Sequence, residues 1–352
     1  ELTSEDKDQN VFISPLSILL ALAMTYNGAV GDTNLAMADA LGFTGFDLEE
    51  LNSGFHDLLV SIKNADSSIE LAIANSIWYK LGYSVKEDFI ERNEKYYSSE
   101  VNEIDFTAPE AVDTINKWIE EATKEKIEKM LDVIPPDAMM YLINAIYFKG
   151  DWTYPFDENY TSDGDFYLLD GTTKKVPMMF QEENFPYYKG DNFSGIKLPY
   201  GQEKIAMYII LPDEGVSLDI VVESLDADRW NEIKESFYGS QVSLVMPKYK
   251  MEYGIKLLND ALISMGMGVA FGFGADFSGI SPDIYISQVL HKAVIEVNEK
   301  GSEAAAATVV EMLETTAMPE EIIQFIVNRP FFFVIADDRT GSILFMGKVV
   351  EP

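Results

Sequence analysis

The chain has 352 residues, of which 47% are hydrophobic, so it is long enough to bury a large core in one or two domains. Its 26 basic and 59 acidic residues give a formal charge of −33, which argues against nucleic acid or an anionic membrane surface as a partner. Cysteine is absent, and no apolar run reaches the roughly 18 residues that a membrane-spanning helix needs.

The first third of the chain is predicted to be mainly helical. Residues 1–10 are polar and are expected to form a frayed or partly helical lead-in. Ser14-Pro15 then marks the start of a buried helix, because proline suits the first helical turn. The elements expected next are amphipathic helices at 35–43 and 46–63, a strand at 68–80 and a helix at 85–98.

The middle of the chain holds the clearest amphipathic helix and a long apolar segment. The helix is predicted over 113–131, with an apolar stripe made of Ile115, Trp118, Ile119, Ala122, Ile127 and Leu131. Residues 137–152 fit helix or strand by periodicity. Their length favours a central strand that runs into a turn at Lys149-Gly150.

The remainder is predicted to be mostly β. Residues 166–212 show alternating strands and a DGT turn signal. The further elements expected are helices at 217–237 and 257–266 and strands at 241–255, 289–297, 321–327 and 330–336. No linker rich in Pro, Gly or Ser and no internal repeat interrupts the chain, which predicts a single α+β domain over 1–352.

Sequence signatures of enzymes are mostly missing. The two histidines, His56 and His291, do not lie in a zinc-binding HExxH pattern. No GxSxG nucleophile elbow or P-loop occurs, and the glycines of 265–274 do not fit GxGxxG. A carboxylate pair can be neither proposed nor dismissed among so many acidic residues. We therefore expect no catalytic residue, no metal and no cofactor.

Residues 299–316, EKGSEAAAATVVEMLETT, allow two interpretations. Their composition favours an alanine-rich surface helix with Ser302 as its N-cap. Read with a period of two, however, small or apolar side chains from Ser302 to Met312 share one face, while Glu303 and Glu311 lie on the other. That second pattern is a strand with one face that can be buried.

A family resemblance decides between them. VNEKGSEAAAAT resembles the hinge of the serpin family, and NRPFFFVIADDRTGSILFMGKVVEP resembles its C-terminal strand pair. The segments ANSIWYK, INKWIEEATKEKI, VPMM and ADFSGIS are also similar to serpins. The resemblance implies an α+β fold of about nine helices around three β-sheets, with a large central sheet and an exposed reactive-centre loop at 299–325. Only a remnant of the family's first helix precedes NVFISP, so this helix is expected to be truncated.

The resemblance also implies site residues. Ser14, Ser17, Asn144 and His291 match a hydrogen-bonded cluster where the central sheet opens. Trp152, Lys248 and Glu299 match the loop-insertion region at the top of the sheet, and a Lys248–Glu299 ion pair is expected there as a surface pair worth about 0–1 kcal/mol. The hinge of the loop comprises Glu299, Gly301, Ser302, Glu303, Ala304, Ala305, Ala306, Ala307 and Thr308.

The function implied is that of a suicide-substrate inhibitor of serine proteases. The family's usual hinge length puts the cleaved bond at Thr315-Thr316, which suits an elastase-like or subtilisin-like protease. A shift in register would instead place Glu314 or Leu313 at that bond and change the target. The alternative is a non-inhibitory carrier or chaperone, which the small residues of the hinge disfavour.

Three further expectations concern the setting of the protein. No heparin site is expected, because Lys63 is the one cation in the matching segment FHDLLVSIKNADSS. The family implies a monomer that acts outside the cell after secretion. Any signal peptide is expected to lie outside this sequence.

Overall fold

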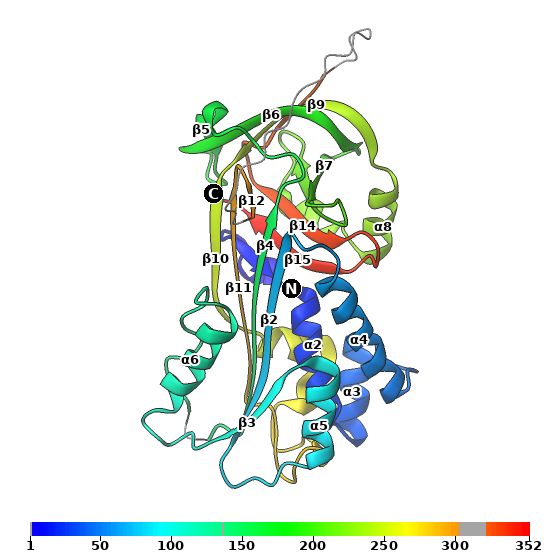
Figure 1. Ribbon diagram of the computed structural model, residues 1–352, viewed down its shortest axis with the longest axis vertical. Coiled ribbons are helices and arrows are strands. Elements are labelled where there is room, and N and C mark those ends of the chain that lie inside the picture. Colours follow the sequence, from blue (N-terminus) through cyan, green and yellow to red (C-terminus); the bar gives the residue numbers. More distant parts are fainter. Residues whose placement is uncertain (1, 136, 303–321) are drawn as a thin grey trace.

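Two β-sheets form the framework of the computed structural model, which describes residues 2–135, 137–302 and 322–352 (Figure 1). The six-stranded sheet runs along the length of the elongated molecule. Its strand order is β10 (Tyr249–Leu257), β11 (Gln288–Asn298), β12 (Gly301–Ser302), β4 (Met140–Asp151), β2 (Ile69–Lys80) and β3 (Glu100–Ile104).

The nine-stranded sheet forms the upper part of the molecule in Figure 1. Its strands are, in order, β1 (Val11–Ile13), β15 (Ile343–Val349), β14 (Phe331–Asp337), β8 (Ile205–Pro212), β7 (Phe193–Tyr200), β6 (Thr173–Lys189), β9 (Tyr238–Pro247) and β13 (Ile323–Ile326), with β5 (Ser162–Tyr167) paired to β6. The expected three sheets form two hydrogen-bonded networks, because the long strand β6 pairs with β9 and also with β7.

The α-helices of the described residues are α1 (Leu2–Glu5), α2 (Pro15–Tyr26), α3 (Gly31–Leu41), α4 (Leu48–Lys63), α5 (Glu87–Tyr97), α6 (Ala111–Ala122), α7 (Leu218–Glu223), α8 (Ala227–Glu235) and α9 (Asn259–Leu262). The two faces of the six-stranded sheet have separate cores. Ile143 of β4 packs in a cluster with Ile115 of α6, whereas Leu142 packs in the cluster that includes α2, α4 and α5. Because successive side chains of a strand point to opposite faces, β4 is buried on both sides.

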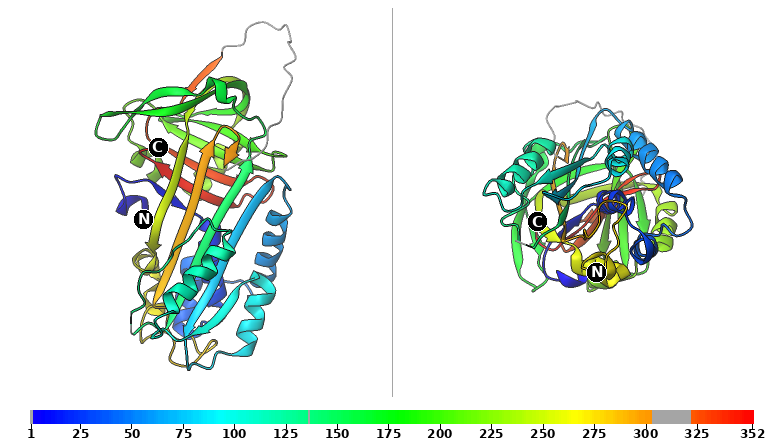
Figure 2. Two further views of the ribbon diagram at one scale, coloured as in Figure 1. Left: turned by 60° about the vertical axis from the view of Figure 1, so that its left-hand side comes forward. Right: turned by 90° about the horizontal axis from the view of Figure 1, so that it is seen from below.

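Local sequence signals explain why α2 begins where it does. Ser14 is its N-cap, and the Ser14 hydroxyl accepts a hydrogen bond from the Ser17 backbone N–H, while Pro15 occupies the first turn. This start places α2 between the two sheets, in contact with β4 and β15 (Figure 2). Among the described residues, no helix is long and apolar enough to cross a membrane.

The helix predicted over 113–131 is wrong in its second half. α6 ends at Ala122, because Lys124 and Glu125 adopt positive φ angles of 54° and 63° that no α-helix continues. Ile127 and Leu131 are still buried, as the apolar stripe predicted. The segment that follows α6 is held by Asn116, whose Oδ1 accepts hydrogen bonds from the backbone N–H groups of Met130 and Leu131.

Three further boundaries differ from expectation. The turn expected at Lys149-Gly150 is wrong, because β4 continues to Asp151 and Gly150 pairs with Ile69. The single strand predicted over 241–255 is divided at Lys248 into β9 and β10, which belong to different sheets. Similarly, the helical region 217–237 forms two helices, α7 and α8.

Candidate functional site

The candidate site is the seam between β4 and β11 in the six-stranded sheet. These strands pair in parallel, with Gln288 opposite Tyr141 and Val294 opposite Tyr147. Beyond the Val294–Tyr147 pair the two strands no longer pair with each other. The short strand β12 lies between them there and pairs antiparallel to both. The lower seam is therefore closed, while its top already holds one added strand.

A buried cluster of polar side chains joins the two strands across the closed seam. His291 and Asn144 are register partners, and the imidazole Nδ1 contacts Asn144 Oδ1. The Asn144 amide donates hydrogen bonds to the Ser17 hydroxyl and, over 3.0 Å, to the Ser17 backbone carbonyl. Ser14 lies on the other side of the imidazole, since its backbone N–H donates to Nε2 over 3.2 Å. The structure thus brings together all four residues that the sequence assigned to this cluster.

The protonation of His291 follows from its partners. The Ser14 N–H is a donor, so Nε2 must accept, and a neutral imidazole then carries its proton on Nδ1. Nδ1 consequently donates to Asn144 Oδ1, which leaves the Asn144 amide nitrogen to donate to Ser17. Complete burial lowers the pKa of His291 from 6.5 to about 3, so the neutral form persists through the physiological range.

Asn75 of β2 is a further member of the cluster that sequence reasoning missed. It is the register partner of Asn144 on the other side of β4, and its Oδ1 accepts a hydrogen bond of 2.5 Å from the Asn144 amide. The available signal was a polar side chain close to the apolar residues Ile73, Ala74 and Ile77 in the strand predicted at 68–80. The cluster therefore spans β2, β4, β11 and the start of α2.

The loop-insertion region lies at the top of the same seam. Lys248 Nζ donates to Glu299 Oε2 over 2.8 Å, and the Thr161 hydroxyl donates to Glu299 Oε1 over 2.7 Å. Burial by itself raises the pKa of the Glu299 carboxyl, but the hydrogen bonds from Lys248 and Thr161 outweigh burial and hold the pKa below its ordinary value.

The expectation of a surface ion pair is wrong for its acidic partner. Glu299 is only 5% exposed, whereas the Lys248 side chain is 38% exposed. The segment at Phe156 also contacts this residue, since the Phe156 N–H donates to the Glu299 backbone carbonyl over 2.8 Å. A buried carboxylate depends on its cation more than a surface carboxylate does.

Trp152 and Tyr200 support the first residues of the hinge. The Trp152 indole N–H donates to the Asn298 carbonyl over 3.0 Å, and its ring stacks on Tyr200 with centroids 4.4 Å apart. The Tyr200 and Ser302 hydroxyls are 2.7 Å apart. Burial raises the pKa of Tyr200 far above its ordinary value, which keeps this hydroxyl protonated. Tyr200 is the second residue that the sequence did not indicate.

Gly301 fits a space that leaves no room for a side chain. Its φ is +154°, and a Cβ atom there would lie 2.1 Å from the Gly150 carbonyl oxygen and 2.7 Å from the Asp151 Cα. These are backbone atoms of β4, which side-chain rotation cannot move away. Glycine at this position is therefore what lets β12 approach β4.

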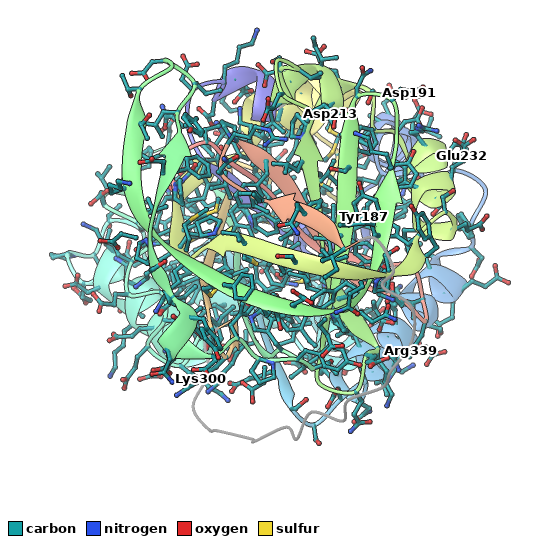
Figure 3. The ribbon with its side chains drawn as sticks, turned by 90° about the horizontal axis from the view of Figure 1, so that it is seen from above. Tyr187, Asp191, Asp213, Glu232, Lys300 and Arg339 are labelled. Atoms are coloured by element: carbon teal, nitrogen blue, oxygen red, sulfur yellow. The ribbon has the colours of Figure 1, made fainter. Side chains whose placement is uncertain are left out.

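The remaining predicted site residues lie outside the described residues. They are the hinge residues Glu303, Ala304, Ala305, Ala306, Ala307 and Thr308 and the residues proposed for cleavage, Leu313, Glu314, Thr315 and Thr316. Figure 3 looks down on the end of the molecule where this segment begins. Lys300 lies at one margin of this end, opposite Asp191 and Asp213.

No metal centre is found in the part of the chain that the structure describes, since no three carboxylate, imidazole or thiol groups are gathered as ligands there. What the site offers instead is a set of strand contacts. At the top of the seam, β12 lies between β4 and β11. Lower down, β4 and β11 pair directly and the buried cluster around His291 and Asn144 joins them.

Comparison with known proteins places this geometry in a family. A sequence model described as Serpin (serine protease inhibitor) matches residues 1–352. An uncharacterised serpin-like protein of Thermococcus kodakarensis is 38% identical, over 98% of this chain and 81% of the relative. The leukocyte elastase inhibitor of Bos taurus is 37% identical, over 100% of this chain and 95% of the length of that relative. The crystal structure of tengpin, a thermophilic serpin in the native state, superposes with a TM-score of 0.91 at 34% identity, covering 99% and 90% of the two chains.

Proposed function

The chain belongs to the serpin family of serine protease inhibitors, and from this membership we propose that it is a suicide substrate that traps its target protease. The observation that carries the proposal is β12. Gly301 and Ser302 already occupy the top of the β4–β11 seam, paired to both strands in the direction that a longer inserted strand needs.

The register of β12 sets how much of the loop the seam can accept. Ser302 pairs with Gly150, and each later residue would pair one position lower in β4. The ten residues 303–312 would therefore reach Met140, where β4 begins. Thr308, six residues beyond Ser302, would fall between Asn144 and His291 and separate them. Its hydroxyl could replace the hydrogen bond that this separation breaks.

The side-chain pattern of the loop agrees with that register. Ser302 faces the core that contains Tyr200, so the small or apolar residues at every second position after it would face the same core. Glu303 and Glu311 would face the α6 side. Ten residues paired to β4 and β11 would contribute roughly 1 kcal/mol net for each hydrogen bond, on the order of 10 kcal/mol. Insertion would give up only the seven parallel positions of the closed seam.

The protease supplies all the covalent chemistry in this proposal. Its serine Oγ attacks the Thr315 carbonyl carbon and forms an ester bond. The peptide bond to Thr316 breaks, and the new amine of Thr316 takes the proton that the serine lost. Insertion then carries the ester to the opposite end of the sheet and distorts the protease before water can attack. No residue of this chain acts as an acid, base or nucleophile.

The proposed target has a small, apolar specificity pocket, as elastase-like and subtilisin-like proteases have. Threonine at position 315 carries this part of the proposal. The bovine relative's name, leukocyte elastase inhibitor, is in keeping with such a target. No Lys or Arg occurs from Gly301 to Ile326, which argues against a trypsin-like protease.

The test is to mix the protein with an elastase-like and a subtilisin-like protease and to analyse the products by denaturing gel electrophoresis and intact-mass measurement. A complex that survives boiling, together with a released fragment that begins at Thr316, would support both the trap and the bond. Cleavage without any complex, for every protease tried, would contradict inhibition.

A second candidate function is favoured by a groove of about 930 Å³ between α2, α8 and the nine-stranded sheet. Its lining is mainly apolar and includes Leu22, Trp230 and Phe332. A non-inhibitory carrier would use such a groove for an apolar ligand. Binding of the fluorescent probe 1-anilinonaphthalene-8-sulfonate distinguishes the carrier from the inhibitor. A carrier would bind the probe and melt at a higher temperature in its presence. Its melting temperature would not rise when the loop is cleaved, whereas that of an inhibitor would.

A further inference from the structure

The hydroxyl group of Tyr141 is buried and has no hydrogen-bond partner among the described residues. Tyr141 is the second residue of β4, and 0% of its surface is exposed. Its ring packs edge-on against Phe106, with centroids 5.4 Å apart, in the cluster on the α6 side of the six-stranded sheet. A buried tyrosine hydroxyl usually finds a partner, because an unpaired donor inside a protein costs free energy. This exception needs an explanation.

The chemistry of the Tyr141 hydroxyl is that of a donor. Burial, together with the nearby Asp137 charge, raises the pKa of Tyr141 to about 12, so the hydroxyl keeps its proton at physiological pH. A donor forms its strongest hydrogen bond with a charged acceptor such as a carboxylate. The neighbouring strands place no carboxylate opposite Tyr141, since its register partners are Gln288 of β11 and Trp78 of β2.

The register of β12 assigns one loop residue to this position under the proposed function. Ser302 pairs with Gly150, and each later residue would pair one position lower in β4, so Glu311 would pair with Tyr141. The same extension along β11, starting from Ser302 opposite Val297, brings Glu311 beside Gln288. The two extensions agree, because Tyr141 and Gln288 are register partners across the closed seam.

The side of the sheet is also the right one. Ser302 faces the core that contains Tyr200, and Glu311, nine positions later, would face the opposite side, where the Tyr141 ring packs. The Cβ atoms of residues directly opposite each other in antiparallel strands are about 4.5–5.5 Å apart. Two side chains as long as glutamate and tyrosine can therefore meet across this distance.

The other carboxylate on that face of the loop gives the same kind of match. In the same register, Glu303 would lie opposite Lys149 of β4. Both acidic residues that face the α6 side would thus meet a donor of β4, one at each end of the inserted segment. A buried carboxylate without a donor would oppose insertion, because burying a charge is costly unless the charge is paired.

We propose that Tyr141 is the hydrogen-bond donor that receives the Glu311 carboxylate when the cleaved loop inserts, an inference that rests on the proposed function. The step forms one hydrogen bond and changes no covalent bond. Before insertion the protein bears the cost of an unpaired buried donor, and after insertion the donor is paired. Tyr141 therefore adds to the free-energy difference that drives insertion, and it acts on the native and inserted forms in opposite directions.

The experiment measures the two forms separately with Tyr141→Phe, which removes the hydroxyl and keeps the ring. Native protein and protein cleaved at a bond after Met312, with the cut identified by intact mass, are each unfolded in guanidinium chloride. The temperature is set so that the cleaved parent has a measurable midpoint. Tyr147→Phe is the matched control, because Tyr147 lies on the same face of β4 and would pair with Ala305, whose side chain has no acceptor.

We expect Tyr141→Phe to shift the two forms differently. The native variant should unfold at the same guanidinium concentration as the native parent or at a higher one, because an unpaired buried donor is gone. The cleaved variant should lose about tenfold or more in its folding equilibrium constant, because Glu311 loses its donor. Tyr147→Phe should shift both forms alike. Adding Glu311→Ala to Tyr141→Phe should restore most of the loss in the cleaved form.

Two results would contradict the inference at different levels. Equal shifts of the native and cleaved forms on Tyr141→Phe would overturn the pairing of Tyr141 with Glu311 and leave the inhibitor proposal standing. A cleaved parent chain that unfolds at the same guanidinium concentration as the native parent would show that the loop does not insert, and would overturn both.

Discussion

Lys248 and Glu299 form an ion pair of 2.8 Å in which one partner is buried and the other is partly exposed. The pair joins the junction between β9 and β10 to the residues between β11 and β12. Because the exposed cation compensates a buried carboxylate, the contact is more than a surface pair.

Replacement of Lys248 by methionine should destabilise the closed sheet. We expect a loss of about 1–3 kcal/mol in the free energy of unfolding, because a buried charged acceptor loses its partner. The loss should lie near the lower limit of this range, since water screens an ion pair whose cation is more than a third exposed. Denaturant titration measures the loss.

Two controls accompany Lys248→Met. Lys175→Met removes the exposed Lys175–Asp165 pair and should leave the denaturation midpoint unchanged. Glu299→Gln in the Lys248→Met background should restore part of the lost stability, because the buried group is then neutral. If the double substitution is no more stable than the single one, burial of the Glu299 charge is not the cause.

Acid should weaken the seam through His291. The unfolded chain binds a proton near pH 6.5, while the native pKa is about 3, so the native state loses stability as pH falls from 6.5 toward 3. The loss at pH 5 is about 2 kcal/mol, at about 1.4 kcal/mol for each pH unit. Paired carboxylates such as Glu299, whose pKa is lowered, add their own loss only at more acidic pH.

Unfolding titrations at pH 7, 6 and 5 check this, with His291→Gln as the comparison. The variant should start less stable than the parent and show a smaller decrease between pH 7 and 5. A decrease of equal size in both proteins would show that groups other than His291 govern the pH dependence.

Gly301→Ala should drive β12 out of the top of the seam. The added methyl group would overlap the Gly150 carbonyl oxygen, and the positive φ would be strained as well. We expect slower loop insertion, seen as more inhibitor cleaved for each protease molecule trapped. Gly254→Ala is the matched control, since nothing lies within 4 Å of its added Cβ. Unchanged stoichiometry for Gly301→Ala would contradict the close approach of β12 and β4.

The hydrogen bond between Tyr200 and Ser302 should show strong non-additivity. Ser302→Ala leaves the fully buried Tyr200 hydroxyl unpaired, at a cost of about 1–3 kcal/mol. Tyr200→Phe in addition removes the unpaired group and should recover most of that cost. Thermal unfolding of the two single variants and the double variant gives the coupling. Additive losses would mean that the two hydroxyls do not act on one another.

The sequence predicted the fold well where periodicity and familial segments were strong. The start of α2 at Ser14-Pro15 is confirmed, because both capping signals are local. The end of α6 was missed, since the positive φ angles at Lys124 and Glu125 belong to residues that ordinarily favour helix. The division at Lys248 was missed because adjacent strand sequences carry no mark of the sheet that each one joins.

The site was predictable as a set of residues but not in its energetics. The resemblance supplied Ser14, Asn144 and His291, which the structure brings together. Asn75 was not indicated, because its contact depends on the register between β2 and β4. The burial of Glu299 was also missed, since its carboxylate is held by residues far away in the sequence, such as Thr161 at a separation of 138 residues.

The two-residue turn between β11 and β12 has a consequence for the order in which the chain folds. Extending that hairpin needs only neighbouring residues, whereas closing the seam brings Asn144 to His291 across 147 residues. Local pairing ordinarily forms first. An extended hairpin would occupy the edge of β11 that β4 pairs with in the closed seam. Synthesis from the N-terminus counters this, because β4 leaves the ribosome before β11, and β11 before residues 303–316. We therefore expect newly made chains to reach the closed seam in higher yield than chains refolded from denaturant.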